Sequence, residues 1–236
     1  MEADWSVEAG DELPGIVVPW GDEAGRGDVR SGDVRAGGAA PGLAHAGEED
    51  DAPTQASDTL ATLHFVDLAE TGSNPLASSS ARVEQIAEAR DHPVLASALT
   101  RLNAAGSRVF TSKCDVWELA SEEIDPSEFD AAGVSDFGMA CYVDVVFRDA
   151  VEVASFAWQE GWMRRTVERL RAIRLRCAAV ELVLRGAEIH GCAGFAVSVY
   201  VSGCGASRAG SQAAWAAALE AVAGVICSEQ RKDQEL

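Results

Sequence analysis

The sequence predicts an α+β fold: a two-layer sandwich with a mainly antiparallel sheet, in the order β-β-α-β-β-α from about residue 108. Polar and apolar residues alternate in four short segments after that residue, and two longer segments have apolar residues at helical spacing. Alternation gives each strand one buried and one less buried face, which is typical of an antiparallel sheet covered by helices on one side. We also expect two preceding short helices and a disordered N-terminal tail.

The first 57 residues have the composition of a disordered acidic tail. They contain 13 Asp and Glu against three Arg, are rich in Gly and Ala, and show no sustained periodicity. Such a segment cannot bury enough apolar surface to offset the entropy of ordering it. The apolar cluster at Leu13–Trp20 is either a docking motif or a chance grouping. We predict a disordered acidic tail at 1–57 and a single α+β domain at 58–236.

The segment before the sheet predicts two short helices. Residues 60–68 fit either a strand or a short docked segment. Ser80 can cap a helix that runs through Arg90, and Pro93 can start a second helix that Gly106 stops. Further on, Asp125 and Pro126 are typical of the start of a short helix through Ala132.

The four predicted strands are recognised by alternation, and each has one expected inward set of residues. These sets are Phe110, Cys114 and Val116; Met139, Cys141, Val143, Val145 and Phe147; Val180, Leu182 and Leu184; and Phe195, Val197, Val199 and Val201. A helix is expected over 153–173 and another over 207–226. The last helix aligns Trp215, Ala218, Leu219, Val222 and Ile226 along one stripe.

The charge of the chain restricts its partners. The net charge is −19 at pH 7, and such a charge repels nucleic acid backbones and anionic lipid surfaces. We therefore expect no generic nucleic acid binding and no membrane binding. The N-terminal residues do not resemble a secretory signal, and no apolar run reaches the ~18 residues of a membrane span. We expect a cytoplasmic protein whose six cysteines are reduced.

One face of the predicted helix at 153–173 carries an unusual set of side chains. Trp158, Trp162, Arg165 and Arg169 fall within a narrow arc, and Trp and Arg dominate interface hot spots. If this face is exposed, it marks a partner-binding surface. The alternatives are that the helices before residue 106 cover it, or that the arginines stack on the indoles within the monomer.

The same region is rich in arginine. Six of the 19 basic residues of the chain lie within 13 positions, from Arg164 to Arg176. The natural ligand of this basic strip is acidic: a protein partner, a phosphate-bearing molecule, or the protein's own tail.

Two weak candidates for catalysis stand apart from that face. Glu160 falls on the apolar stripe of the helix, where burial would raise its pKa and suit it to proton transfer. The favoured alternative is that Glu160 sits at the stripe's edge and reaches water or pairs with an arginine. The turn Gly203–Ser207 joins a strand to the last helix. Cys204 within it lies near a helix N-terminus, which can lower a thiol pKa, although a plain tight turn is the favoured interpretation.

The sequence contains no motif that is diagnostic of catalysis, of a metal site or of a cofactor. His190, Cys192 and Cys204 lack the paired spacing of a metal site, and no nucleophile stands with a base. The leading hypothesis is a non-catalytic protein-interaction or assembly module that binds a protein partner or itself. The alternative is a small-molecule enzyme or ligand-binding domain using Glu160 and the Gly203–Ser207 turn.

Overall fold

The computed structural model describes residues 1–8, 16–18, 82–129 and 135–228. The elements in chain order are β1 (Glu2–Glu8), β2 (Ile16–Val18), α2 (Ala87–Asp91), α3 (Pro93–Leu102), β3 (Val109–Leu119), the 3₁₀ turns η2 (Ser121–Glu123) and η3 (Pro126–Phe129), β4 (Phe137–Phe147), α4 (Ala150–Ala154), α5 (Phe156–Arg171), β5 (Ala178–Ile189), β6 (Cys192–Gly205) and α6 (Arg208–Ser228). The α+β class and the order β-β-α-β-β-α after residue 108 are confirmed. The predicted segment at 60–68, Ser80 and the end of the helix predicted through Ala132 lie outside the described residues.

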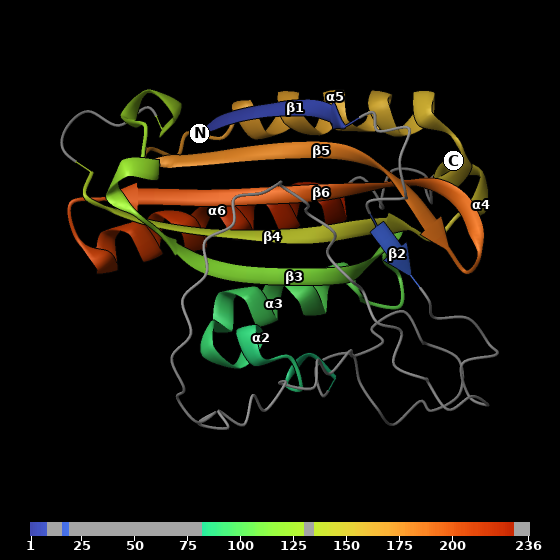
Figure 1. Cartoon of the computed structure of the whole chain (residues 1–236), viewed down its shortest axis with the longest axis horizontal. Coiled ribbons are helices and arrows are strands. Elements are labelled where there is room, and N and C mark those ends of the chain that lie inside the picture. The colour runs from blue at the N-terminus through green and yellow to red at the C-terminus, as the bar shows by residue number, and fades with distance from the viewer. Residues whose placement is uncertain (9–15, 19–81, 130–134, 229–236) are drawn as a thin grey trace, which may run out of the picture. The chain divides into compact units, whose positions relative to one another are not determined.

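One mixed sheet organises the domain, with the strand order β1-β5-β6-β4-β3 (Figure 1). Strands β3, β4, β6 and β5 pair antiparallel with their neighbours, whereas β1 and β2 both pair parallel with β5. Figure 1 shows α6 behind β4 and β6, and α5 behind β1. The two longest helices of the described residues therefore lie on the same side of the sheet.

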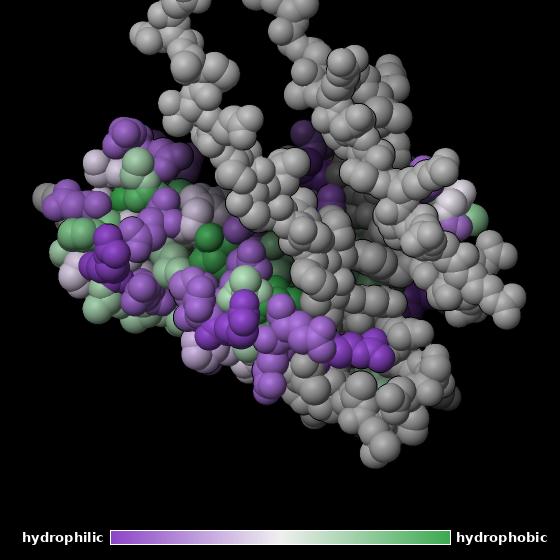
Figure 2. All heavy atoms as spheres, turned by 60° about the horizontal axis from the view of Figure 1, so that its bottom comes forward, coloured by the Kyte–Doolittle hydropathy of each residue, from purple (hydrophilic) through white to green (hydrophobic). Residues whose placement is uncertain are grey.

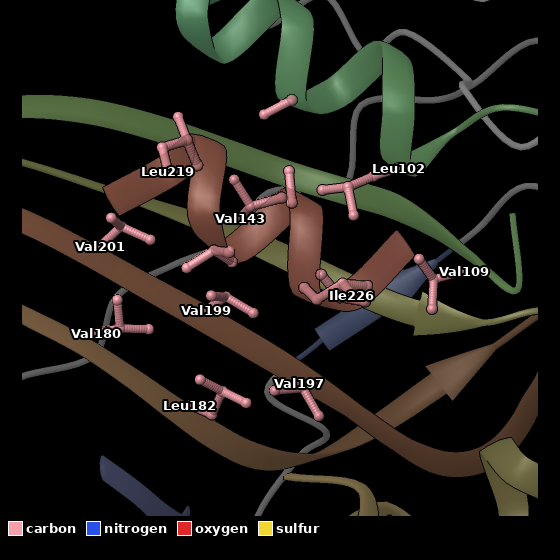
Figure 3. Close-up of a cluster of buried hydrophobic side chains, with 14 of the residues drawn as sticks. Leu102, Val109, Val143, Val180, Leu182, Val197, Val199, Val201, Leu219 and Ile226 are labelled. Carbon is pink, nitrogen blue, oxygen red and sulfur yellow. The ribbon is translucent and has the colours of Figure 1, made fainter. Parts of the chain in front are cut away.

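The core lies between this side of the sheet and α6 (Figure 3). Val143, Val199 and Leu182 are direct cross-strand neighbours on β4, β6 and β5, and all three are buried. The α6 stripe packs on them through residues that include Leu219 and Ile226. All five residues predicted for that stripe are buried. Burying side chains of this size contributes about 1.5–3 kcal/mol each.

Helix α6 lies unusually close to strand β6. A Cβ atom placed on Gly203 would lie 2.3 Å from the backbone nitrogen of Trp215, and one on Gly205 would lie 2.9 Å from that of Ser211. The length and composition of α6 would suffice to cross a membrane. In this structure its apolar stripe instead packs on the sheet, and Trp215 is 2% exposed.

A β-bulge changes the predicted inward set of β3. The register with β4 shifts between Thr111 and Cys114, so Cys114 lies on the helix side while Phe110 lies on the opposite face with Val146. Asn103, at the end of α3, holds the bulge: its side-chain oxygen accepts from the Thr111 amide at 2.9 Å, and its Nδ2 donates to the Thr111 hydroxyl at 2.8 Å. Simple alternation cannot register such an extra residue.

The helix predicted over 153–173 is two helices. Helix α4 starts earlier, where the Asp149 side chain accepts from the amides of Val151 and Glu152. Its last residue is followed by Ser155, whose side chain accepts from the amide of Trp158 and caps α5. Two local caps within seven residues account for the break.

Two segments of the predicted tail are strands of the sheet. Strand β1 pairs with residues 179–185 of β5 and β2 pairs with residues 187–189, and both belong to the same compact unit as the sheet. These two segments of residues 1–57 therefore belong to the sheet, whereas the prediction placed them in the disordered tail. Ala3, Trp5 and Val7 alternate with polar residues, which is the period of a strand. This alternation is short, however, and the composition of the whole segment indicates disorder.

The two edge strands protect their outer backbone groups. On β1, the Asp4 carboxylate accepts from the amide of Trp5 at 2.8 Å, and on β3 the Asp115 carboxylate accepts from the amide of Val116 at 2.7 Å. An outer amide that is already bonded is a poor site for another strand. Edge-to-edge pairing through β1 or β3 is therefore disfavoured.

We expect Gly203→Ala to destabilise the domain because its methyl group would collide with the backbone of α6. Overpacking of this kind costs about 1–3 kcal/mol, and more where backbone must move. The control is Gly186→Ala in neighbouring β5, where a Cβ meets no atom within 4 Å. Urea unfolding should show a large loss for Gly203→Ala and little change for Gly186→Ala. Equal stability of the two variants would contradict the close approach.

Candidate functional site

The tryptophans of the predicted partner surface are packed inside the domain. Trp162 is 3% exposed and stacks edge-on against Phe147, with ring centres 5.0 Å apart. Trp158 is half-buried, lies 4.7 Å from the same ring, and is covered by the Arg108 guanidinium at 5.0 Å. The expectation of an exposed Trp face is wrong, because α5 turns this face toward the end of β4. Within the monomer, the guanidinium over the Trp158 ring is that of Arg108, which is not one of the two predicted arginines.

The two arginines of that surface have different surroundings. Arg169 is half-buried and donates to the backbone oxygen of Val225 at 3.3 Å and to the Ser228 hydroxyl, so it ties α5 to the end of α6. Arg165 is exposed and makes no ion pair or hydrogen bond within the described residues. Of the four predicted partner-binding residues, only Arg165 remains open to a ligand.

Glu160 lies at the edge of the buried stripe of α5. Its carboxylate pairs with Arg164 one turn later at 2.9 Å, and its side chain is 29% exposed. The buried stripe is instead occupied by two polar residues, Gln159 and Thr166, next to the apolar ones. Gln159 Nε2 donates to the backbone oxygen of Phe195 at 2.8 Å, which fixes the rotation of the helix. Glu160 therefore has the surroundings of a surface ion pair.

The Gly203–Ser207 turn is shaped for helix packing. The space beside Gly203 and Gly205 is filled by the backbone of α6, which leaves no cradle for an anion. Ser207 caps the helix, as expected, by accepting from the amide of Gly210 at 3.1 Å. Cys204 is 1% exposed, and burial raises its pKa, so the expectation of a lowered thiol pKa is wrong. The proposed enzyme site thus loses both of its elements.

Metal-binding clusters are not found in the described part of the chain: no group of three His, Cys, Asp or Glu residues lies close enough to hold an ion. His190 has a positive φ of 52° in the turn between β5 and β6, with Gly191 after it. Cys192 is exposed there, while Cys204 is buried at the far end of β6. The residues considered from sequence for a metal are therefore not brought together.

The structure does bring the arginine strip onto the acidic N-terminal strand. Arg164 of α5 stacks over the Trp5 ring at 4.7 Å. Two turns later, Arg171 donates through Nε to the backbone oxygen of Ala3 at 2.7 Å and lies 3.6 Å from the Asp4 carboxylate. Of the three ligands considered for the basic strip, the protein's own N-terminal segment is the one the structure places there.

A third arginine reaches β1 from the other face of the sheet. Arg185 of β5 forms an ion pair of 2.6 Å with Glu8. The Ser6 hydroxyl donates to Glu181 at 2.9 Å on the same face. We call Arg164, Arg171 and Arg185 the arginine clamp, because together they hold β1 from both faces of the sheet. Sequence spacing places the first two on one helix face, but nothing in the sequence links Arg185 to them.

More basic charge lies beside the clamp. Arg174 and Arg176, in the connection to β5, are exposed and, like Arg165, form no ion pair or hydrogen bond within the described residues. Three exposed arginines that have no acidic partner among the described residues are unusual in a chain of net charge −19. These arginines could bind acidic groups in addition to those of β1.

The opposite, helix-free side of the sheet carries a second group of polar and aromatic residues. The rings of Trp117 and Tyr142 lie 6.4 Å apart, those of Tyr142 and Tyr200 5.9 Å apart, and Arg185 donates to the Tyr200 hydroxyl at 2.9 Å. Beside this row, the Ser198 hydroxyl donates to the buried Asp144 carboxylate at 2.6 Å. Alternation predicts these outward positions on β4 and β6, but it does not predict the cross-strand neighbours.

Exposed apolar side chains do not form a patch in the described residues. The large ones are Val7, Phe137, Val151 and Phe156, on four different elements. The visible part of the face in Figure 2 likewise mixes hydrophilic side chains with small hydrophobic areas. Recognition by a broad apolar surface is not indicated there.

Comparison of the chain with protein-family models, with curated proteins and with solved structures finds no match.

We expect Trp162→Ala to destabilise the domain by about 3–5 kcal/mol, as loss of a large core aromatic does. Arg165→Ala, on the exposed side of the same helix, should change stability by no more than about 0.5 kcal/mol. The free energies of unfolding in urea provide the measurement. A Trp162→Ala variant as stable as the wild type would mean that this face is not part of the core.

Asp144 gives a pH prediction. Burial raises its pKa above the ordinary 3.8, although the Ser198 hydroxyl acts in the opposite direction. The folded state therefore keeps this proton at pH values where the unfolded chain has lost it, so the contribution of Asp144 to stability falls as pH rises through that window. Asp144→Asn removes the titrating carboxyl group, so the variant does not lose stability in this way. We expect the variant to gain stability relative to the wild type as pH is raised from about 3 to 7.

Asp125 provides a control, because its contribution to stability changes with pH in the opposite direction. Hydrogen bonds from Ser127 lower the pKa of Asp125, so its contribution is present above pH 3.8 and is lost as pH falls through the lowered pKa. Asp125→Asn should therefore lose stability relative to the wild type over the same rise in pH. Identical pH profiles of the two variants would contradict the assigned surroundings of Asp144.

Proposed function

We propose that this domain is a non-catalytic protein-interaction module that binds acidic, extended segments as a parallel strand on the outer edge of β5, within the arginine clamp. The carrying observation is that the acidic strand β1 occupies this edge, with Arg164 on Trp5, Arg171 on Ala3 and Asp4, and Arg185 on Glu8. Strand addition of this kind gives affinity through backbone hydrogen bonds and selectivity through side chains.

The energies of the individual contacts to β1 suggest which contacts provide affinity and which provide selectivity. The Arg171–Asp4 pair is exposed on both sides, and such pairs contribute about 0–1 kcal/mol. Most of the binding energy therefore comes from the backbone ladder to β5, from the burial of Ala3 and from the stacking of Arg164 on Trp5. The clamp selects acidic segments, because a basic residue at position 4 or 8 would face an arginine.

The charge of the whole chain supports a protein partner. A net charge of −19 disfavours nucleic acid and anionic membranes, yet Arg165, Arg174 and Arg176 leave basic capacity near the clamp. An acidic segment longer than β1 could use these arginines as well. The same pairing could join two copies if the N-terminal segment of one binds the edge of another.

The test releases the edge within the full-length protein. In a variant with Asp4→Arg, Trp5→Ala and Glu8→Arg, the chain's own segment should leave β5. A labelled peptide with the sequence of residues 1–20 should then bind with micromolar affinity in fluorescence anisotropy. Wild-type protein should bind it at least about tenfold more weakly, because the covalently attached segment competes at high effective concentration.

Three controls define the result. A peptide in which Asp4 and Glu8 are replaced by Lys should not bind. Arg171→Glu in the released variant should weaken binding, whereas Arg90→Glu, at an exposed position of α2, should not. Light scattering distinguishes a partner-binding monomer from a dimer joined by exchanged segments. If the released variant is folded by circular dichroism and the peptide does not bind, the proposed function is wrong.

A further inference from the structure

Two cysteines far apart in sequence are neighbours at the start of β5. Ala178 pairs with Gly203 in the antiparallel ladder, and the next residues outward are Cys177 and Cys204. The Cys204 amide donates to the backbone oxygen of Cys177 at 2.9 Å, which extends the ladder by one pair. Both cysteines are reduced in this structure.

The backbone at Cys177 is strained. Its φ is +57°, a left-handed conformation that non-glycine residues adopt at an energetic cost. The position is held by the amide of Cys177, which donates to the backbone oxygen of Phe129 at 3.0 Å. Glycine would suit this backbone better, so a cysteine here is a feature that packing alone does not explain. Strain of this kind is concentrated at functional positions.

We propose that Cys177 and Cys204 form a redox-active thiol pair that closes to a disulfide when a small disulfide such as oxidised glutathione reacts with Cys177. Opposed residues of an antiparallel ladder have Cα atoms about 5.5 Å apart, within the range that a disulfide requires. Cys177 is half-buried and can meet the oxidant, whereas Cys204 is buried beneath it. The inference is independent of the function proposed for the β5 edge.

The reaction has two exchange steps. The Cys177 thiolate attacks one sulfur of oxidised glutathione, which forms a mixed disulfide and releases one glutathione thiolate. The Cys204 sulfur then attacks Sγ of Cys177 and gives its proton to a glutathione thiolate, and the second glutathione leaves. Glutathione disulfide gains two electrons, and the two cysteines lose one each. Burial raises the pKa of Cys204, which makes it the resolving thiol and Cys177 the point of entry.

The other cysteines are less suited to this chemistry. Cys192 is exposed in the β5–β6 turn and should accept glutathione without a partner to resolve it. Cys114 and Cys141 lie on neighbouring strands, but burial raises both pKa values to about 12. They provide internal comparisons within one protein.

The test oxidises the folded full-length chain with oxidised glutathione, blocks remaining thiols with N-ethylmaleimide and maps the peptides without reduction. We expect a Cys177–Cys204 disulfide, glutathione on Cys192, and unmodified Cys141. In Cys204→Ser, Cys177 should retain glutathione as a stable mixed disulfide. In Cys177→Gly, which suits the left-handed backbone, Cys204 should stay reduced.

Several outcomes would overturn the proposal. One is wild-type protein that is folded by circular dichroism and carries glutathione on Cys177 together with a reduced Cys204. Another is a disulfide that joins Cys114 to Cys141 in preference. If Cys204→Ser does not fold, the wild-type map and the Cys177→Gly variant still decide between these results.

Discussion

A Cβ atom on Gly203 would come within 2.3 Å of the backbone nitrogen of Trp215, so the start of α6 can rest on β6 only because no side chain stands between them. This contact sets the depth of the helix over the middle of the sheet. Trp215 can then bury itself against the strands and meet the ring of His92 edge-on at 5.5 Å. Helix α3 starts directly after His92 and also packs on α6. One tight helix–strand contact thus positions much of the helical layer.

The buried amide of Gln159 helps to fix how α5 is turned. The buried stripe of this helix includes Gln159 and Thr166, and the Gln159 amide finds acceptors in the backbone of Glu152, Val153 and Phe195. These hydrogen bonds favour the observed rotation of the helix over one that buries Phe156 and Glu160, because a buried N–H group without an acceptor costs free energy. This rotation brings Trp162 into the core. It also places Arg164 and Arg171 over β1.

The parts of the fold that follow from local pattern could be predicted from the sequence. Alternation identifies four strands, and the spacing of Trp215, Leu219 and Ile226 identifies the stripe of α6. The bulge at Thr111 and the strand at Glu2–Glu8 could not be predicted in the same way, because each depends on a partner distant in sequence: Asn103 for the bulge and β5 for the strand.

The candidate site shows the same limit. Hydrophobic spacing places Met163, Val167 and Leu170 in the core correctly, but it also includes exposed Phe156 and misses Gln159, Trp162 and Thr166. The affinity of six clustered arginines for acidic groups could be predicted from charge alone. The contributions of Arg185 and the pairing of Cys177 with Cys204 depend on the sheet register, which single-sequence patterns do not provide.

The arrangement of charge explains how an acidic chain can hold an acidic strand of its own. Strand β1 satisfies the clamp through Asp4 and Glu8, so the chain supplies the ligand that its own arginines require. Its exposed ion pairs are weak, and Val7 is 38% exposed, so much of the hold on β1 depends on the backbone ladder. Under the proposed function, a partner with more acidic side chains would have further arginines available in the connection to β5, namely Arg174 and Arg176. Binding of a partner would then depend on the difference in binding free energy between the partner strand and β1. Because β1 is covalently attached and competes for the same edge of β5, it would set the affinity that a partner must exceed.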